Sequence, residues 1–133
     1  MTRVLIDTSA WIDFFRDPVS SYGLIVDRLL KDDLACTCNL VIAELVPATR
    51  TRKAFLELSN FLGALPMLSD PPDMWNKVKE AGFILRRKGV SGVGIPDLII
   101  AVVSQFYDAP VFSKDRDFTA MREYLGLVLF EPF

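Results

Sequence analysis

Histidine is absent from the 133-residue sequence, and its absence excludes several kinds of catalytic site. A Ser-His-Asp or Cys-His arrangement cannot form, and neither can a zinc site with histidine ligands. Histidine is also the commonest general acid or base near neutral pH. Any catalysis by this chain must therefore use carboxylates, lysine, tyrosine, hydroxyl groups or a bound metal ion.

Cysteine, long apolar runs and positive charge are scarce as well. Cys36 and Cys38 are the only cysteines, and we expect them to be buried, reduced thiols. No apolar run approaches the roughly 18 residues of a membrane helix, and no signal peptide precedes the first predicted strand. We therefore expect a cytoplasmic protein. The formal charge of −2 is not that of a generic nucleic-acid binder.

Short apolar segments alternate with amphipathic helical patterns along the whole chain, which is 51% hydrophobic. The predicted strands cover residues 4–6, 34–38, 65–68, 111–113 and 127–130. Such alternation is typical of a parallel sheet whose crossover helices cover both faces. We therefore predict one α/β domain over residues 1–133, a three-layer α/β/α sandwich with a mainly parallel sheet of four to five strands.

Three helix boundaries carry specific signals. The apolar run that starts at Leu98 fits either a strand or a buried helix, but Pro96 and Asp97 directly before it favour a helix start. Asn39 is expected to cap the N-terminus of one helix. Gly63 is expected to follow the last residue of another.

The first predicted strand, Val4 to Ile6, ends directly at Asp7. Continuous apolar runs of this kind are typical of strands buried in parallel sheets. Ligands of such sheets bind beyond the carboxyl ends of the strands, where Asp7 would lie. An N-cap of the following helix is an equally simple role for Asp7. The other acidic residues decide between the two roles.

Three further acids stand at positions that a structural role alone does not explain. Asp115 follows the fourth predicted strand, as Asp7 follows the first. Glu44 lies inside the apolar run 40–46, and Asp97 opens an entirely apolar run. Burying a lone carboxylate is costly, and no basic residue within these runs can pair with it. A cation shared by all four carboxylates would balance their charge.

Mutual repulsion argues against a group of acids without a cation. Two carboxylates about 4 Å apart repel each other by roughly 4 kcal/mol at an effective dielectric constant near 20. Oxygen ligands without histidine or paired cysteine favour a hard ion, Mg²⁺ or Mn²⁺. Such an ion orients water, lowers its pKa and stabilises charge on a phosphate. The sequence therefore indicates phosphodiester hydrolysis by metal-activated water.

At these residues the sequence resembles the PIN-domain ribonucleases, and within them the VapC-type toxins of toxin–antitoxin pairs. The matching segments are residues 4–9 with 11–12, 43–45, 96–101 and 113–118. Each motif alone is weak, but four motifs in the order and spacing of the family are specific. The resemblance implies a PIN-like fold and a Mg²⁺- or Mn²⁺-dependent endoribonuclease.

The resemblance also implies roles for individual residues. The implied catalytic acids and metal ligands are Asp7, Glu44, Asp97 and Asp115, with Asp117 as an auxiliary ligand or a helix cap. Thr8 and Ser113 match supporting hydroxyl positions, and Ser9 adjoins the first of them. RNA is the implied substrate. The implied protein partners are a second copy in a homodimer and a cognate VapB-type antitoxin that inhibits the enzyme.

Basic and aromatic residues near these motifs have two interpretations each. The candidate phosphate contacts are Arg86, Arg87, Lys88, Lys114 and Arg116. Solvated surface, or charge that complements a helix dipole, explains them equally well. The aromatic residues that could stack on bases are Trp11, Phe14, Phe15 and Trp75. Their helical spacing favours the core or a subunit interface.

Other classes of protein also gather carboxylates in this way. A response-regulator phosphoacceptor needs an acidic pair after the first strand, but Thr8 follows Asp7. A haloacid-dehalogenase-type phosphatase needs an aspartate where Ser9 stands. A non-catalytic module with an acidic groove remains a third alternative, and it predicts partner binding without metal-dependent cleavage.

Overall fold

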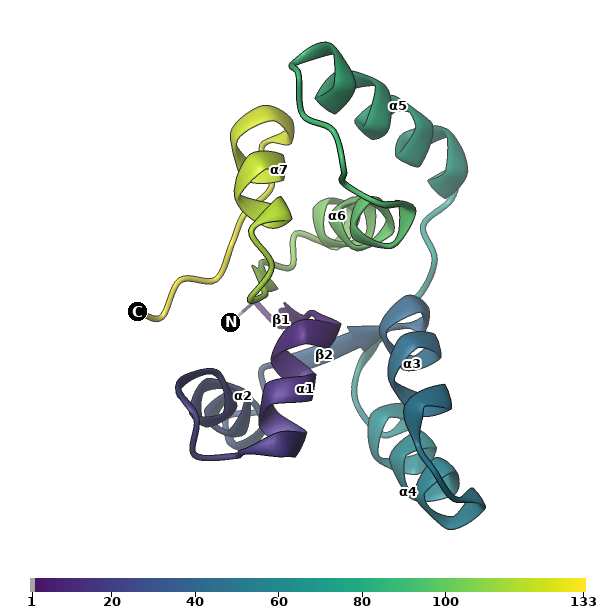
Figure 1. Cartoon of the computed structure of the whole chain (residues 1–133), viewed down its shortest axis with the longest axis vertical. Helices are drawn as coiled ribbons and strands as arrows, with labels where there is room; N and C mark the ends of the chain where they lie inside the picture. Colours follow the sequence, from purple (N-terminus) through teal and green to yellow (C-terminus); the bar gives the residue numbers. More distant parts are fainter. Residues whose placement is uncertain (1) are drawn as a thin grey trace.

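The computed structural model describes residues 2–133 (Figure 1). The strands in this range are β1 (Val4–Ile6), β2 (Ala35–Cys38), β3 (Met67–Leu68) and β4 (Val111–Phe112). The helices are α1 (Thr8–Arg16), α2 (Ser21–Lys31), α3 (Asn39–Leu45), α4 (Arg52–Gly63), α5 (Met74–Arg87), α6 (Ile95–Tyr107) and α7 (Asp117–Leu125), with a short 3₁₀ turn, η1 (Val46–Ala48), after α3.

The strands form one sheet in the order β3-β2-β1-β4, and every pair is parallel. Helices α5, α6 and α7 lie on one side of the sheet, and α1 to α4 lie on the other (Figure 1). The predicted three-layer α/β/α sandwich is confirmed. Strand β1 is central, with Ile6 opposite Phe112 of β4, so the residues that follow these two strands are neighbours.

Burial in the core explains why the sequences of β1 and α6 are continuously apolar. All three residues of β1 are buried, and so are the residues of α6 from Leu98 to Ser104. Full burial of such an aliphatic side chain contributes about 1.5–3 kcal/mol. Helix α6 begins one residue before Pro96, so the prediction of a helix at this position is confirmed.

Several predicted boundaries differ from the structure. Residues 127–130 form only an isolated bridge between Leu129 and Val111, not a fifth strand. Asn39 is the first residue of α3 and makes no cap, because the helix begins one residue earlier than predicted. Gly63 is the last residue of α4 and does not have the left-handed conformation that a glycine after a helix provides.

None of the helices within residues 2–133 combines the length and the apolar character that crossing a bilayer requires.

Candidate metal centre

Asp7 lies at the carboxyl end of β1, and its side chain both caps a helix and faces the candidate site. Its Oδ2 atom accepts a hydrogen bond from the backbone N–H of Ser9 at 3.4 Å, which caps α1. The same atom accepts hydrogen bonds from the hydroxyls of Ser9 at 2.8 Å and Ser113 at 2.7 Å. Asp7 is only 4% exposed, so these donors replace the water that burial removes.

Ser113 connects the ends of the two neighbouring strands. Its hydroxyl donates to Asp7 and accepts from the backbone N–H of Asp115 at 2.9 Å. The Ser9 hydroxyl accepts from the backbone N–H of Lys114 at 3.0 Å. Each hydroxyl has one proton and directs it to Asp7, so the loop after β4 is held against β1 by these two serines.

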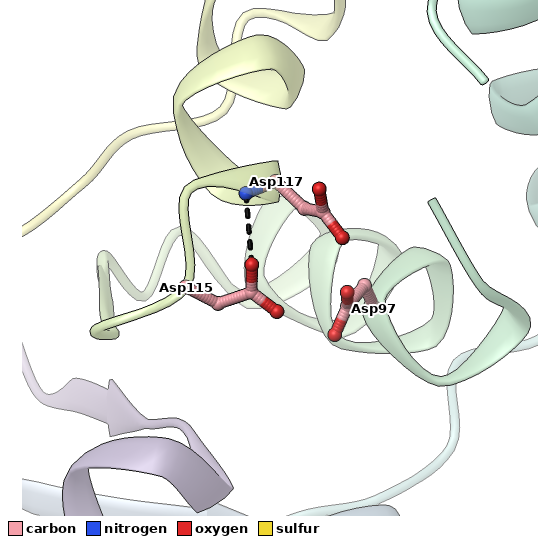
Figure 2. A group of neighbouring side chains, drawn as sticks. All are labelled: Asp97, Asp115 and Asp117. Atoms are coloured by element: carbon pink, nitrogen blue, oxygen red, sulfur yellow. Dashed lines mark hydrogen bonds between the residues drawn. The ribbon is translucent and has the colours of Figure 1, made fainter. Parts of the chain in front are cut away.

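Asp97, Asp115 and Asp117 form a group of acids beside this pair of strands. Figure 2 shows the three side chains converging, Asp97 from α6, Asp115 from the loop before α7, and Asp117 from the first turn of α7. One carboxylate oxygen of each lies within 4.8 Å of the others. The Asp117 backbone N–H donates to Oδ1 of Asp115 at 2.9 Å, so Asp115, not Asp117, supplies the side-chain oxygen at the start of α7.

Burial and neighbouring acids raise the pKa of Asp97 to about 7. Loss of solvent is the largest cause, followed by the negative charges of Asp115 and Asp7 and by a hydrogen bond with Asp117. Asp97 lies in the first turn of α6, where the helix dipole favours negative charge, but this does not offset the acids opposite it. The site therefore has an excess of negative charge near neutral pH.

The four acids predicted from the sequence are not equally placed. Asp97 and Asp115 belong to the group of three, and Asp7 is close enough for its charge to affect Asp97. Glu44 is exposed, contrary to the prediction that the apolar run around it would bury its side chain. Its Oε1 atom accepts a hydrogen bond from the Thr8 hydroxyl at 2.7 Å. Thr8, which follows Asp7 in the chain, therefore links Glu44 to the N-terminal end of α1.

Asp117 is placed more centrally than its sequence context predicts. As an auxiliary acid or cap, it was expected to be secondary to Asp115, but its carboxylate joins the group on the same terms as Asp97. It is also half-buried, whereas Asp115 is exposed. Asp117 is the first residue of α7, and no local sequence signal indicates its place, because that place depends on how α7 packs beside α6.

The candidate phosphate contacts have different surroundings. The ammonium group of Lys114 pairs with Asp13 at 3.0 Å, and the guanidinium of Arg87 lies 5.8 Å from the ring of Phe83. Arg86, Lys88 and Arg116 are exposed. Of the four aromatic residues expected in the core or at a subunit interface, Trp11 is fully buried, whereas Trp75 is 60% exposed. Trp75 is therefore not part of the core.

The donor set fits a divalent cation. Three carboxylates converge, and within residues 2–133 none of them lies within 4.0 Å of a lysine or arginine nitrogen. Carboxylate oxygens are ligands that Mg²⁺ and Mn²⁺ prefer. Burial and the nearby negative charges of Asp115 and Asp7 raise the pKa of Asp97, as expected where no basic side chain balances the acids. A cation is the simplest group that would do so.

Comparison with known proteins places this arrangement in a family. A family model described as the PIN domain matches residues 4–124. The chain belongs to the PIN-domain family. Among PIN-domain relatives, ribonuclease VapC21 from Mycobacterium tuberculosis is 30% identical over 119 residues, which are 88% of this chain and 84% of the relative.

Solved structures give the same fold. VapBC2 from Rickettsia felis, bound to a DNA fragment from its promoter, has a TM-score of 0.76 at 19% identity and covers 97% of this PIN domain and 98% of its own chain. VapBC-5 from Mycobacterium tuberculosis, described as a member of the VapBC family of toxin–antitoxin systems, has a TM-score of 0.60 at 25% identity over 91% of each chain. The likeness to both structures extends over more than nine-tenths of the chain.

Proposed function

We propose that this PIN-domain protein is an endoribonuclease that hydrolyses RNA phosphodiester bonds with the help of Mg²⁺ or Mn²⁺. The observation that carries the proposal is the convergence of Asp97, Asp115 and Asp117 without a balancing basic side chain in the described residues. The name of its relative, ribonuclease VapC21, supports the choice of reaction.

The proposed ligands of the ion are Asp97, Asp115 and Asp117, with Asp7 and Glu44 completing the acidic site. When bound, a divalent ion stabilises charge on the phosphate and lowers the pKa of a water molecule. The chain contributes orientation. Ser9 and Ser113 fix the Asp7 carboxylate by donating to Oδ2, and Thr8 fixes Glu44.

The nucleophile in this proposal is water, and the products carry a 5′-phosphate and a 3′-hydroxyl. A route through the RNA 2′-hydroxyl would need an acid–base pair of the kind that histidines provide, and the chain has no histidine. Analysis of the product ends therefore tests the mechanism separately from the activity.

We also propose that the enzyme is the toxin of a pair, held inactive in the cytoplasm by a VapB-type antitoxin, and that it forms a homodimer. The likeness to VapBC-5, a member of a toxin–antitoxin family, supports an antitoxin partner. Exposed apolar side chains on α5, such as Trp75 at 60% and Phe83 at 64%, are compatible with a further protein interface.

The proposal is tested with purified protein and single-stranded RNA. We expect cleavage with Mg²⁺ or Mn²⁺, none with EDTA, and a loss of at least about a hundredfold in the Asp115→Asn variant. Glu57→Gln is the matched control, because Glu57 is an exposed acid on α4 whose ion pair within residues 2–133 is with Lys53. Millimolar Mg²⁺ should raise the melting temperature of the wild type but not of Asp115→Asn. Metal-independent cleavage would contradict the proposal, and tight antitoxin binding without any cleavage would favour a non-catalytic acidic module.

A further inference from the structure

A hollow lies beside the metal centre and has no role in the proposed chemistry. Its volume is about 490 Å³, within the range of about 300–1,000 Å³ that is usual for ligand pockets. It is enclosed by α2, by the loop between β4 and α7, and by the residues after α7. Ser113 and Asp115 line the hollow and also belong to the metal centre. An occupant of this hollow would therefore adjoin the scissile phosphate.

Aromatic rings form one wall of the hollow. The ring of Tyr22 stacks on Phe112, with centroids 5.3 Å apart and planes at 26°. The ring of Phe133 meets Tyr22 edge-on at 5.2 Å, and Phe130 meets Phe112 in the same way at 5.9 Å. Phe133 is 73% exposed, so most of its ring surface is open to an incoming ligand. Exposed rings of this kind are the usual stacking partners of unpaired bases.

The charges around the hollow leave one cation without an ion pair. Lys114 is paired with Asp13 at 3.0 Å, and Glu131 is paired with Arg122 outside the pocket lining. Arg116 lines the hollow, and no carboxylate in residues 2–133 lies within 4.0 Å of its guanidinium. A free guanidinium beside aromatic rings suits a ligand that combines a phosphate with a flat base.

We propose that this hollow binds the base and sugar of a nucleotide next to the scissile phosphate, in a single-stranded RNA. This inference rests on the proposed function. In an RNA duplex the bases are stacked on one another and cannot turn into a side pocket, so an unpaired strand is the form that fits. Phe133 and Tyr22 form the aromatic wall against which the base packs, and Arg116 binds the adjacent phosphate.

The test compares aromatic and aliphatic side chains at the wall. Phe133→Leu and Tyr22→Leu keep apolar bulk but remove the flat ring, whereas Tyr22→Phe keeps the ring. Phe106→Leu is the matched control, because Phe106 is 45% exposed at the opposite end of α6 from Asp97. Binding of a fluorescent single-stranded hexaribonucleotide is measured by anisotropy with Ca²⁺ in place of Mg²⁺. We expect about tenfold weaker binding for both leucine variants and no change for Tyr22→Phe or Phe106→Leu.

A second measurement locates the nucleotide. Hexamers that lack one base at successive positions are bound by the wild type and by Phe133→Leu. We expect one position next to the cleaved bond where base removal weakens wild-type binding about tenfold but no longer affects the Phe133→Leu variant. Because Phe133 is exposed, this variant keeps its fold, and a melting temperature within a few degrees of wild type verifies it.

The outcomes separate this inference from the proposed function. Asp115-dependent cleavage together with unchanged binding by both leucine variants would overturn the pocket and leave the nuclease in place. Phe133-dependent binding without cleavage by the wild type would support the pocket and contradict the nuclease. Weaker binding of the antitoxin by Phe133→Leu, with RNA binding unchanged, would assign the hollow to a protein segment and overturn the inference.

Discussion

Asp7 lies at the same edge of the sheet as the group formed by Asp97, Asp115 and Asp117, but the hydrogen bonding and burial of its carboxylate differ from theirs. Asp7 is buried, and its Oδ2 atom accepts hydrogen bonds from two hydroxyls and one backbone N–H. Asp97, Asp115 and Asp117 are more accessible and converge on one another, and the Asp117 backbone N–H donates to the Asp115 carboxylate. The fold satisfies the first carboxylate internally, whereas the second group is the proposed site of an external cation.

The difference shows how a small domain keeps a strongly acidic site without losing its fold. A buried carboxylate that accepts charge-assisted hydrogen bonds contributes to stability, because the groups that donate to it would otherwise be unpaired. A group of converging carboxylates opposes folding until a cation binds. The same sheet edge therefore contains a preformed part and a part that we propose to be stabilised by a metal ion.

The largest expected effect is on RNA cleavage, and it should distinguish the converging acids, such as Asp97, from the exposed Glu44. Asp97→Asn is expected to reduce RNA cleavage at least about a hundredfold, because it removes a proposed ligand of the ion. Glu44→Gln should cost less, about tenfold, because Glu44 is exposed and joins the site through Thr8 alone. Both are measured as kcat/KM on the same RNA. Equal losses would mean that Glu44 is a ligand of the same rank.

The next effect concerns Ser113, whose hydroxyl links Asp7 to Asp115. Ser113→Ala removes the donor to Asp7 and the acceptor of the Asp115 N–H, and we expect about a 10–100-fold loss of cleavage. Ser113→Thr keeps the hydroxyl and should recover much of the activity. Ser59→Ala, on α4, is the control. Full activity of Ser113→Ala would show that the two groups act independently.

In the metal-free protein, Asp7→Asn and Asp97→Asn should change the free energy of unfolding in opposite directions. Asp7→Asn should lower the free energy of unfolding by about 1–3 kcal/mol, because its NH₂ group or a neutral oxygen would face donors that now bind a carboxylate. Chemical denaturation in EDTA at pH 7.5 measures this change. Asp7→Asn as stable as the wild type would mean that the serine hydroxyls reorient at little cost.

The last effect is a pH dependence of stability that Asp97 introduces. Its pKa is about 7 in the folded protein and 3.8 in the reference state, so between these values the folded state binds the extra proton. The metal-free protein should therefore lose stability as the pH rises from about 4 to about 7. Asp97→Asn should lose this part of the decline and be more stable than the wild type at pH 8. Identical pH profiles in EDTA would contradict the raised pKa.

Much of the fold could be predicted because local signals and burial agree. Pro96 and Asp97 identified the start of α6, and the alternation of apolar runs with helical patterns predicted the layered sheet. The missing fifth strand shows the limit of such signals. Leu129 makes only one bridge to β4, and no pattern along the chain tells whether a short apolar run finds enough pairing partners.

The types of residue in the site could be predicted from the sequence, but not which of the acids lie at its centre. Asp7, Asp97 and Asp115 stand out because each adjoins an apolar run. Glu44 also adjoins one, yet its side chain is exposed, since a seven-residue helix presents one face to solvent even when its sequence is mostly apolar. Asp117 could not be ranked, because its place depends on how the loop after β4 bends toward α6.

The sequence by itself determined an α/β domain with an acidic residue at the end of a buried strand, because these features depend on hydrophobic periodicity and on helix-start residues near each other in the chain. Only the tertiary structure decided which strands are neighbours. The pairing of β1 with β4 places Ser113 beside Asp7, although 106 positions separate them, and opens the aromatic hollow next to the acids. Contacts of that kind depend on strand order, which local patterns do not specify.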